Sequence, residues 1–384
     1  MENGPALAAL LRQRISDRGG RIPFADYMAA CLYEPGVGYY TSPGRKVGAE
    51  GDFYTSSNVN AAFGRLIARE LAQMWRALGE PADFSAVEVG AGGGRLACDI
   101  LDAIAQEQPA LYRTMTYRFI EAEPSLQGAQ AAICAAHAER LAWSTPADLA
   151  GGQLAITGCF LSNELIDAFP THLVEMTPTG LQEVYVGTGD EGFTESLGEP
   201  SRPEIALYFA RLGIWPVAGQ RAEVNLAAGE WLARVASALE RGFVLTIDYG
   251  YEAPELYNPA RKNGTLLCYW QHRTSDDPYA RPGEQDITSH VDFTTLQQLG
   301  TELGLATVWY GEQYRFLMGC GMMEELLALE QQEKSPEEQL KIRLALKKLL
   351  LPEGGMGDTF KVLIQAKGVT DPQLLCRRDW TRGY

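Results

Sequence analysis

The chain has 384 residues, of which 46% are hydrophobic, and its formal net charge is −16. This length and apolar content allow one large domain with additions or two small domains. A strongly acidic protein repels nucleic-acid phosphates, so we expect neither RNA nor DNA as its substrate.

Cysteine and histidine patterns give no sign of a covalent or metal framework. The seven cysteines include no CxxC pair, and the four histidines are not closely spaced. We therefore predict no disulfide framework and no metal site. The N-terminal sequence lacks the features of a signal peptide, and no apolar run reaches membrane-spanning length. We expect no membrane insertion, with a cytoplasmic location in a bacterium or a mitochondrial one in a eukaryote.

The N-terminal 60 residues differ in pattern from the rest of the chain. Residues Ala6–Arg18 have the apolar spacing of a helix, whereas residues 21–60 are rich in glycine and aromatic side chains. Long segments of this kind in compact proteins often act as lids. We predict that residues 1–60 form an N-terminal helix and a lid segment, and that residues 61–384 form the main domain.

From residue 61 onward, predicted helices and strands alternate, which is typical of a doubly wound parallel sheet. The predicted strands are Ala86–Val89, Tyr117–Glu121, Leu154–Ser162, Gly242–Asp248 and Phe360–Ala366. The predicted helices are Ala61–Leu78, Leu96–Glu107, Ser125–His137 and Gly229–Arg241. Two regions break the alternation, at about 175–222 and 252–292, and we predict that they are insertions on the substrate side.

The most informative segment is VEVGAGGGRLACDI, residues 87–100. It has the pattern of a buried strand, a glycine turn and an amphipathic helix, and glycine lets a ligand approach the main chain closely. The dinucleotide motif GxGxxG fails because Arg95 occupies its sixth position. The pattern ExGxGxG instead matches the first motif of class I S-adenosylmethionine (SAM) methyltransferases. We assign Glu88, Gly90, Gly92 and Gly94 to cofactor binding.

A carboxylate at the end of the second predicted strand is suited to a ribose diol. Glu121 can accept hydrogen bonds from two hydroxyl groups, as an acidic residue does for the ribose of NAD. Glu123 is the local competitor, but it is followed by Pro124 and lies past the strand. In the alternative interpretation, the Glu-Pro-Ser sequence only caps a helix. We favour the ribose role for Glu121.

A third group of polar residues follows the apolar strand 154–162. Ligands of such sheets bind where parallel strands end, so Asn163 and Glu164 are expected to face the cofactor crevice. Asp167 could share a helical face with Glu164, and Pro170 would limit that helix. In the alternative interpretation, Asn163 and Asp167 cap a turn and Glu164 is solvated. Asp248, at another strand end, either contacts substrate or holds a loop by hydrogen bonds.

Seven segments together resemble the MidA-like family, a branch of class I SAM-dependent methyltransferases. They occur in the family's order and cover most of the chain. They are IPFADYMAACLYEPGVGYY (22–40), GDFYTSSNVNAAFG (51–64), VEVGAGGGRLACDIL (87–101), NELIDAFPTHLVE (163–175), VLTIDYGY (244–251), GTLLCYWQHR (264–273) and PGEQDITSHVDFTTL (282–296).

The resemblance implies an α/β fold with a doubly wound, mostly parallel seven-stranded methyltransferase sheet, an N-terminal lid and an inserted substrate subdomain. It also implies SAM as cofactor and a protein substrate, because mitochondrial relatives resemble arginine methyltransferases that modify a subunit of respiratory complex I. On this basis Thr55 and Ser56 of the lid are assigned to the cofactor, and Asp286 and His290 to the substrate side. His290 has a structural alternative as a buried core histidine.

The predicted chemistry is methyl transfer to an arginine side chain. Arginine stays protonated at neutral pH, and opposed carboxylates can hold its guanidinium group in one plane. We predict Glu164 and Asp167 as the catalytic carboxylates. Two alternatives remain open: a methyltransferase for a small molecule or another side chain, and a SAM-binding assembly factor with little turnover.

Overall fold

The computed structural model describes residues 3–42, 61–190, 192–332, 335–350 and 359–379. Its contacts divide the chain into two units, each built from three segments. The first unit contains the described residues of Met1–Tyr54, Ile166–Glu230 and Gly250–Leu296. The second contains those of Thr55–Leu165, Trp231–Tyr249 and Gln297–Tyr384. The predicted boundary at residue 60 stays a prediction, because residues 43–60 lie outside the described ranges.

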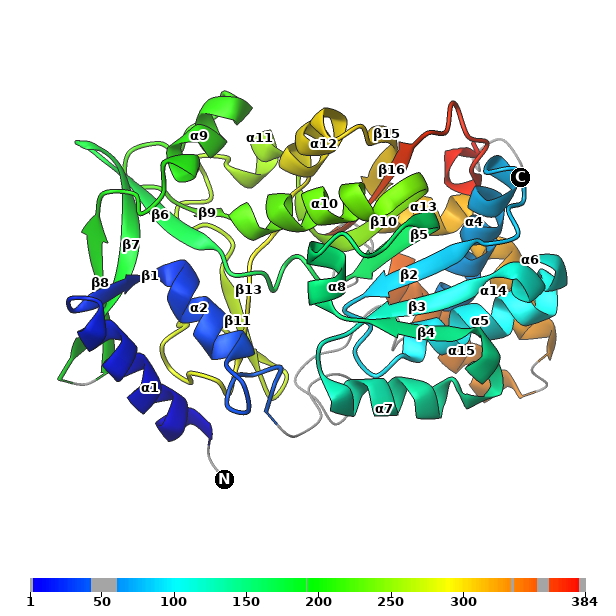
Figure 1. Ribbon diagram of the computed structural model, residues 1–384, viewed down its shortest axis with the longest axis horizontal. Coiled ribbons are helices and arrows are strands. Elements are labelled where there is room, and N and C mark those ends of the chain that lie inside the picture. Colours follow the sequence, from blue (N-terminus) through cyan, green and yellow to red (C-terminus); the bar gives the residue numbers. More distant parts are fainter. Residues whose placement is uncertain (1–2, 43–60, 191, 333–334, 351–358, 380–384) are drawn as a thin grey trace. The chain divides into compact units, whose positions relative to one another are not determined.

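The second unit is built on a mostly parallel sheet with the strand order β15-β16-β10-β5-β2-β3-β4 (Figure 1). The strands are β2 (Ser85–Val89), β3 (Thr116–Ile120), β4 (Leu141–Ser144), β5 (Ile156–Asn163), β10 (Leu239–Tyr251), β15 (Ala306–Glu312) and β16 (Phe360–Lys367). β16 is antiparallel to both of its neighbours, and the other pairs are parallel. This confirms the predicted seven-stranded methyltransferase sheet. A short strand, β14 (Val291–Asp292), pairs with the end of β10.

Helices follow the strands of this unit as the sequence pattern predicts. They are α4 (Ala62–Ala77), α5 (Arg95–Glu107), α6 (Pro109–Thr114), α7 (Pro124–Ile133), α8 (Pro146–Ala150), α10 (Leu226–Ala238), α12 (Phe293–Glu302), α13 (Gln313–Gly319), α14 (Met322–Gln332) and α15 (Pro336–Leu350). Short 3-10 turns occupy Ala135–Arg140 and Leu375–Arg377. The first residues of α10 and α12 belong to the first unit.

The core of the second unit explains why these segments fold as they do. The apolar stripe of α4 is buried, from Phe63 to Trp75, and packs with α5 and the sheet. Alternate residues of β10 share this core, while Val244 between them is also buried. A strand buried on both faces is expected in a parallel sheet covered by helices.

Two predicted helices end too late. The helix predicted as Ser125–His137 is α7, which ends at Ile133, and a 3-10 turn begins at Ala135. The helix predicted as Gly229–Arg241 begins at Leu226 and ends at Ala238, and β10 begins at Leu239. Leu239 and Arg241 pair with Ile156 and Thr157 of β5, so sheet pairing takes these residues from the helix. The helical periodicity of a segment cannot predict its pairing with a strand that is remote in sequence.

The first unit combines the N-terminal segment with both regions that break the alternation. Its elements are α1 (Asn3–Asp17), β1 (Arg21–Pro23), α2 (Phe24–Tyr33), β6 (His172–Thr177), β7 (Gly180–Gly189), β8 (Gly192–Gly198), α9 (Pro203–Leu212), β9 (Arg221–Val224), α11 (Ala253–Leu256), β11 (Leu267–Trp270), β12 (Arg273–Ser275) and β13 (Asp286–Thr288). One sheet joins β1, β6, β7, β8 and β9, and β11, β12 and β13 form a small second sheet. β6 and β7 form an antiparallel hairpin within the region at about 175–222.

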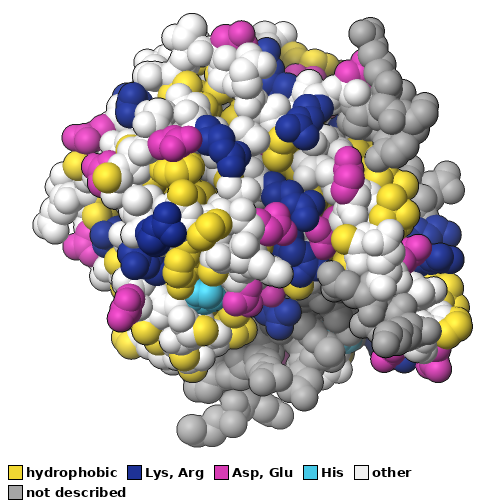
Figure 2. Space-filling model, turned by 90° about the vertical axis from the view of Figure 1, so that its right-hand side faces the viewer, with side chains coloured by type: hydrophobic (Ala, Val, Ile, Leu, Met, Phe, Trp, Pro, Cys, Tyr) yellow, Lys and Arg dark blue, Asp and Glu magenta, His cyan; other side chains and the backbone are white. Residues whose placement is uncertain are grey.

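No described helix is long and apolar enough to cross a bilayer. Figure 2 shows one face, on which Lys and Arg side chains are interspersed with Asp and Glu side chains. The acidic excess therefore does not form one continuous patch on that face.

Candidate SAM-binding site

The glycine turn connects β2, which ends at Val89, to α5, which begins at Arg95. Gly90, Gly92 and Gly94 have φ angles of 74°, 51° and 82°, a region that side-chain-bearing residues adopt only at a cost. A Cβ atom at Gly90 would lie 2.7 Å from Leu165 Cδ1, whereas one at Gly92 would meet open space. The turn therefore presents bare backbone to a space that a ligand can fill.

Glu121 directly follows β3 and is held by two hydrogen bonds. Its Oε1 accepts from the backbone N–H of Glu123 at 2.9 Å, and its Oε2 accepts from Nε2 of Gln130 at 3.2 Å. Burial raises the pKa of Glu121, and these hydrogen bonds oppose the increase. Glu123 is the N-cap of α7 and accepts from the backbone N–H of Ser125 at 3.3 Å, which confirms a cap at the Glu-Pro-Ser sequence. The ribose role of Glu121 stays a prediction.

Gln130 joins two parts of the predicted site, and the sequence did not reveal it. This fully buried side chain of α7 donates from Nε2 to the carbonyl of Gly92 at 2.9 Å as well as to Glu121. Its Oε1 accepts from Nε1 of Trp143 at 2.9 Å. It therefore connects the glycine turn to the predicted ribose carboxylate. A glutamine in an alanine-rich helix gives no motif, so only the tertiary structure identifies it.

The third strand end is organised by Asn163, Glu164 and Asp248. Asn163 Nδ2 donates to Glu164 Oε1 at 3.0 Å. The backbone N–H of Glu164 donates to the carbonyl of Ile247, and Glu164 has a φ of 53°. Asp248 is fully buried and accepts from the backbone N–H groups of Leu165 and Tyr249 at 3.2 and 2.9 Å. The contact with Leu165 holds the segment that follows β5. The predicted substrate contact of Asp248 stays a prediction.

The predicted helical face shared by Glu164 and Asp167 is not formed. Residues 164–169 adopt bends and a turn, and the left-handed backbone at Glu164 stops any helix from continuing after β5. Glu164 belongs to the second unit and Asp167 to the first. Their predicted catalytic roles stay predictions.

Two buried oxygen atoms beside this strand end are suited to a ligand. Ser162 Oγ and Asn163 Oδ1 have no hydrogen-bond partner among the described residues. Burying such groups without a partner is costly, so a ligand that supplies donors would stabilise them. Together with the open backbone at Gly92 and the acceptor Glu121, they fit the hydroxyl and amino groups of SAM.

Glu88 has a described partner within the core. It is 3% exposed and accepts from the hydroxyl of Tyr117 at 2.8 Å. Burial raises the pKa of Glu88 to about 7, although the Tyr117 hydrogen bond opposes this effect. Its predicted contact with the cofactor stays a prediction.

The first unit brings Asp167 and Asp286 close to a pair of tyrosines. Tyr33 and Tyr40 stack with ring centroids 5.6 Å apart. The Tyr40 hydroxyl donates to Asp286 Oδ2 at 2.8 Å, and the Tyr33 hydroxyl donates to the carbonyl of Ala168 at 2.9 Å. Burial, followed by the charges of Asp286 and Asp167, raises the pKa of Tyr40. The two carboxylates are therefore neighbours of one aromatic pair.

His290 also lies in the first unit. Its ring is 5.3 Å from the ring of Tyr251, and its backbone N–H donates to Thr265 Oγ1 at 2.9 Å. Burial, followed by the charge of Arg261, lowers the pKa of His290 to about 4. The imidazole is consequently neutral at physiological pH. The predicted contacts of Thr55 and Ser56, and the lid at 51–56, lie outside the described residues.

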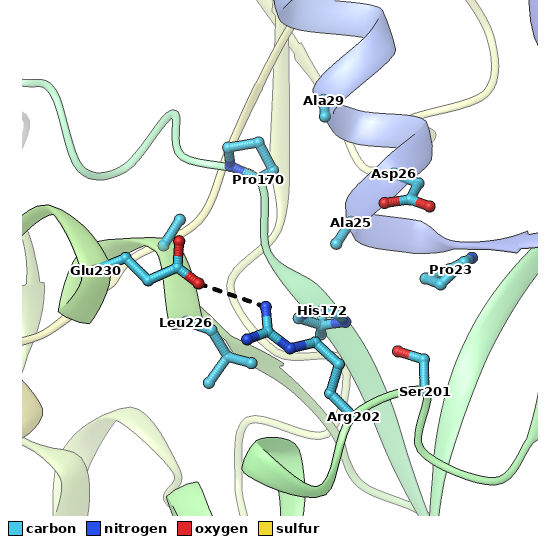
Figure 3. Close-up of a pocket in the computed structure, with 11 residues that line it drawn as sticks. Pro23, Ala25, Asp26, Ala29, Pro170, His172, Ser201, Arg202, Leu226 and Glu230 are labelled. Carbon is cyan, nitrogen blue, oxygen red and sulfur yellow. Dashed lines mark hydrogen bonds and ion pairs between the residues drawn. The ribbon is translucent and has the colours of Figure 1, made fainter. Parts of the chain in front are cut away.

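A separate pocket of about 370 Å³ lies within the first unit (Figure 3). His172 lines it, and Nδ1 of His172 is 2.6 Å from the fully buried carboxylate of Glu183. Arg202 lies 3.4 Å from Glu230 at its wall. None of the predicted site residues that the structure describes lines this pocket.

The sheet order and the glycine turn define a class I methyltransferase fold. A family model described as S-adenosyl-L-methionine-dependent methyltransferase matches residues 66–311. The chain belongs to this family of SAM-dependent methyltransferases. The match confirms the predicted cofactor and the predicted enzyme class.

Relatives resemble almost the full length of the chain. A mitochondrial protein arginine methyltransferase, the NDUFAF7 homolog of Drosophila melanogaster, is 30% identical, and the match covers 95% of this chain and 85% of that protein. NDUFAF7 of Rattus norvegicus is 27% identical over 89% of this chain and 80% of its own length. A crystal structure of a Burkholderia thailandensis protein bound to S-adenosyl-homocysteine is 32% identical, with a TM-score of 0.86, covering 97% of this chain and 95% of that chain.

Proposed function

We propose that this methyltransferase modifies an arginine side chain of a partner protein. The similarity to proteins named protein arginine methyltransferase along nearly the whole chain is the observation that carries this proposal. The family resemblance makes a respiratory-complex subunit the first acceptor to test. The cytoplasmic or mitochondrial location stays a prediction.

Residues of the second unit would hold the cofactor at the strand ends. The backbone around Gly92 would contact the methionine part, Glu121 would accept from the ribose hydroxyls, and Asn163 would supply an amide oxygen. When bound, SAM supplies an electrophilic methyl group on its sulfonium sulfur. Because the chemistry is an in-line displacement, the chain's main task is to orient the acceptor and to exclude water.

Glu164 is the candidate for orienting a cationic acceptor. Its backbone is in a left-handed conformation that costs on the order of 1–3 kcal/mol, and such strain persists where surrounding contacts impose it. The hydrogen bonds of Glu164 and Leu165 to β10 impose it here. A carboxylate fixed in this way can accept from a guanidinium group and hold one nitrogen toward the methyl group. The catalytic role of Asp167, in the first unit, stays a prediction.

The experiment that tests this proposal incubates the protein with tritiated SAM and an extract of a strain that lacks the gene. Transfer of labelled methyl groups into the extract is then measured. We expect a labelled protein band whose hydrolysate contains labelled methylarginine. Label in small molecules, or in another amino acid, would instead establish the alternative methyltransferase. Absence of label despite binding of SAM would establish a SAM-binding assembly factor and contradict the proposal.

A further inference from the structure

Gln130 links two parts of the SAM site that are separated by 29 residues in sequence. One Nε2 group donates to both the Gly92 carbonyl and the Glu121 carboxylate. Its amide has two N–H bonds, so it can serve both acceptors at once. Because the acceptors belong to the turn after β2 and to the end of β3, the amide fixes one relative to the other.

The orientation of the Gln130 amide is itself determined. Trp143 Nε1 donates to Oε1, which requires the amide nitrogen to point toward Gly92 and Glu121. The indole ring of Trp143 is held by stacking on Phe119, with centroids 5.5 Å apart. The side chain of Gln130 is also packed against the turn, since a Cβ at Gly94 would lie 3.1 Å from its Cα and Cγ. Gln130 is therefore rigid and has little freedom to adjust.

We propose that Gln130 is a positioning residue for SAM binding. Its amide aims the Glu121 carboxylate at the ribose hydroxyls and fixes the distance between that carboxylate and the glycine turn. The inference rests on the proposed ribose role of Glu121. Without this donor the Glu121 carboxylate can rotate. Each rotation away from the ribose weakens the hydrogen bonds that the two ribose hydroxyls donate to it. The selectivity for an intact ribose diol should consequently depend on Gln130.

The test replaces Gln130 by methionine, which preserves length and removes the amide. Binding of S-adenosyl-homocysteine and of its 3′-deoxy analogue is measured by calorimetry on the full chain. In the unmodified protein we expect the missing hydroxyl to weaken binding by about tenfold or more, as for a hydrogen bond to a charged group. In Gln130→Met this factor should fall to about threefold or less, together with weaker binding of S-adenosyl-homocysteine. The KM for SAM should rise, with kcat retained at saturating SAM.

Gln127→Met is the matched control. Gln127 lies on the same helix and donates to the backbone carbonyl of Glu121 at 3.2 Å, so its loss leaves the carboxylate in place. Trp143→Phe removes the hydrogen bond that orients the Gln130 amide but leaves the amide itself, so its effect should lie between those of the other two variants. We expect both variants to keep the ribose discrimination better than Gln130→Met. An equal loss in Gln127→Met and Gln130→Met would assign the effect to packing of the helix and overturn the proposal.

The Glu121→Ala variant distinguishes two possible errors: that Gln130 does not position Glu121, and that Glu121 does not bind the ribose. If Glu121→Ala keeps full discrimination between the two ligands, the ribose role of Glu121 is wrong. If Glu121→Ala loses it while Gln130→Met keeps it, the ribose role stands and the positioning role of Gln130 is wrong. Urea unfolding of each variant identifies any that fails to fold.

Discussion

Two neighbouring carboxylates, Glu121 and Glu123, have different tasks because their partners differ. Glu121 is 9% exposed and is held by a backbone N–H and by Gln130, whereas the half-buried Glu123 caps α7. Charge-assisted hydrogen bonds in a buried site are worth more than exposed ones, because water competes less there. The residue that faces inward at the strand end is therefore the better ligand for a diol.

Glu121→Ala is expected to weaken S-adenosyl-homocysteine binding by about 1.5–3 kcal/mol, through loss of charge-assisted hydrogen bonds. Glu123→Ala should change the binding free energy much less and should instead destabilise the start of α7 by about 1 kcal/mol. Calorimetry and urea unfolding measure the two effects. The reverse pattern of affinities would show that the ribose contact lies at Glu123.

Glu164→Gln retains the shape of the side chain and its hydrogen bond from Asn163 while it removes the charge. If Glu164 orients a cationic acceptor, methyl transfer to protein should fall by tenfold or more, on the order of the 1.5–3 kcal/mol of a charged hydrogen bond, with nearly unchanged S-adenosyl-homocysteine affinity. Asp167→Asn should act in the same direction, less severely. Loss of cofactor binding in Glu164→Gln would place Glu164 on the cofactor side instead.

At the scale of elements, the sequence pattern predicts those strands, turns and helices that are determined by interactions within the same segment. The strand, glycine turn and helix at residues 85–107 follow from their own sequence, because positive φ angles at alternate positions require glycine. The conformation after β5 could not be predicted in this way. Asp248 holds the N–H of Leu165 from 83 residues away, and this contact replaces the predicted helix. Gln130 was missed for the same reason, since its partners are remote in sequence.

Two adjacent glycines of the turn provide a matched pair of variants. A Cβ at either Gly92 or Gly93 would meet open space, but only Gly92 has a positive φ. Gly92→Val should abolish S-adenosyl-homocysteine binding, because the side chain both strains the turn and enters the space that the ligand needs. Gly93→Val should retain more affinity. Equal binding by Gly92→Val and the unmodified protein would exclude the turn from the site.

At the scale of the whole molecule, segments that are remote in sequence are brought together by sheet pairing, which the pattern within each segment does not predict. The first unit collects three stretches of chain into one core, in which α1 and α2 pack against β7. The sequence showed where the alternation of strands and helices stops, but not that these stretches share a fold. Contacts of such long sequence separation leave no periodic signal in any one segment.

We expect Glu88 to make the free energy of unfolding depend on pH. The pKa of Glu88 is raised by burial to about 7, so the unfolded state releases its proton at lower pH than the folded state. The stability that the protonated carboxyl contributes is present below about pH 4.5 and is lost as pH rises through 7. Relative to the unmodified protein, Glu88→Gln should gain on the order of 3 kcal/mol of unfolding free energy between pH 5 and pH 8, measured in urea. A difference that does not change with pH would contradict this assignment.

Calorimetric titration of the full chain with S-adenosyl-homocysteine, with NAD as the comparison ligand, tests the central claim most directly. That claim is that residues at the strand ends of the second unit bind SAM. We predict one S-adenosyl-homocysteine bound per chain, binding lost in Gly92→Val and weakened in Glu121→Ala, and no heat of binding from NAD. Binding of NAD without any response to S-adenosyl-homocysteine, or full affinity in both variants, would contradict the account.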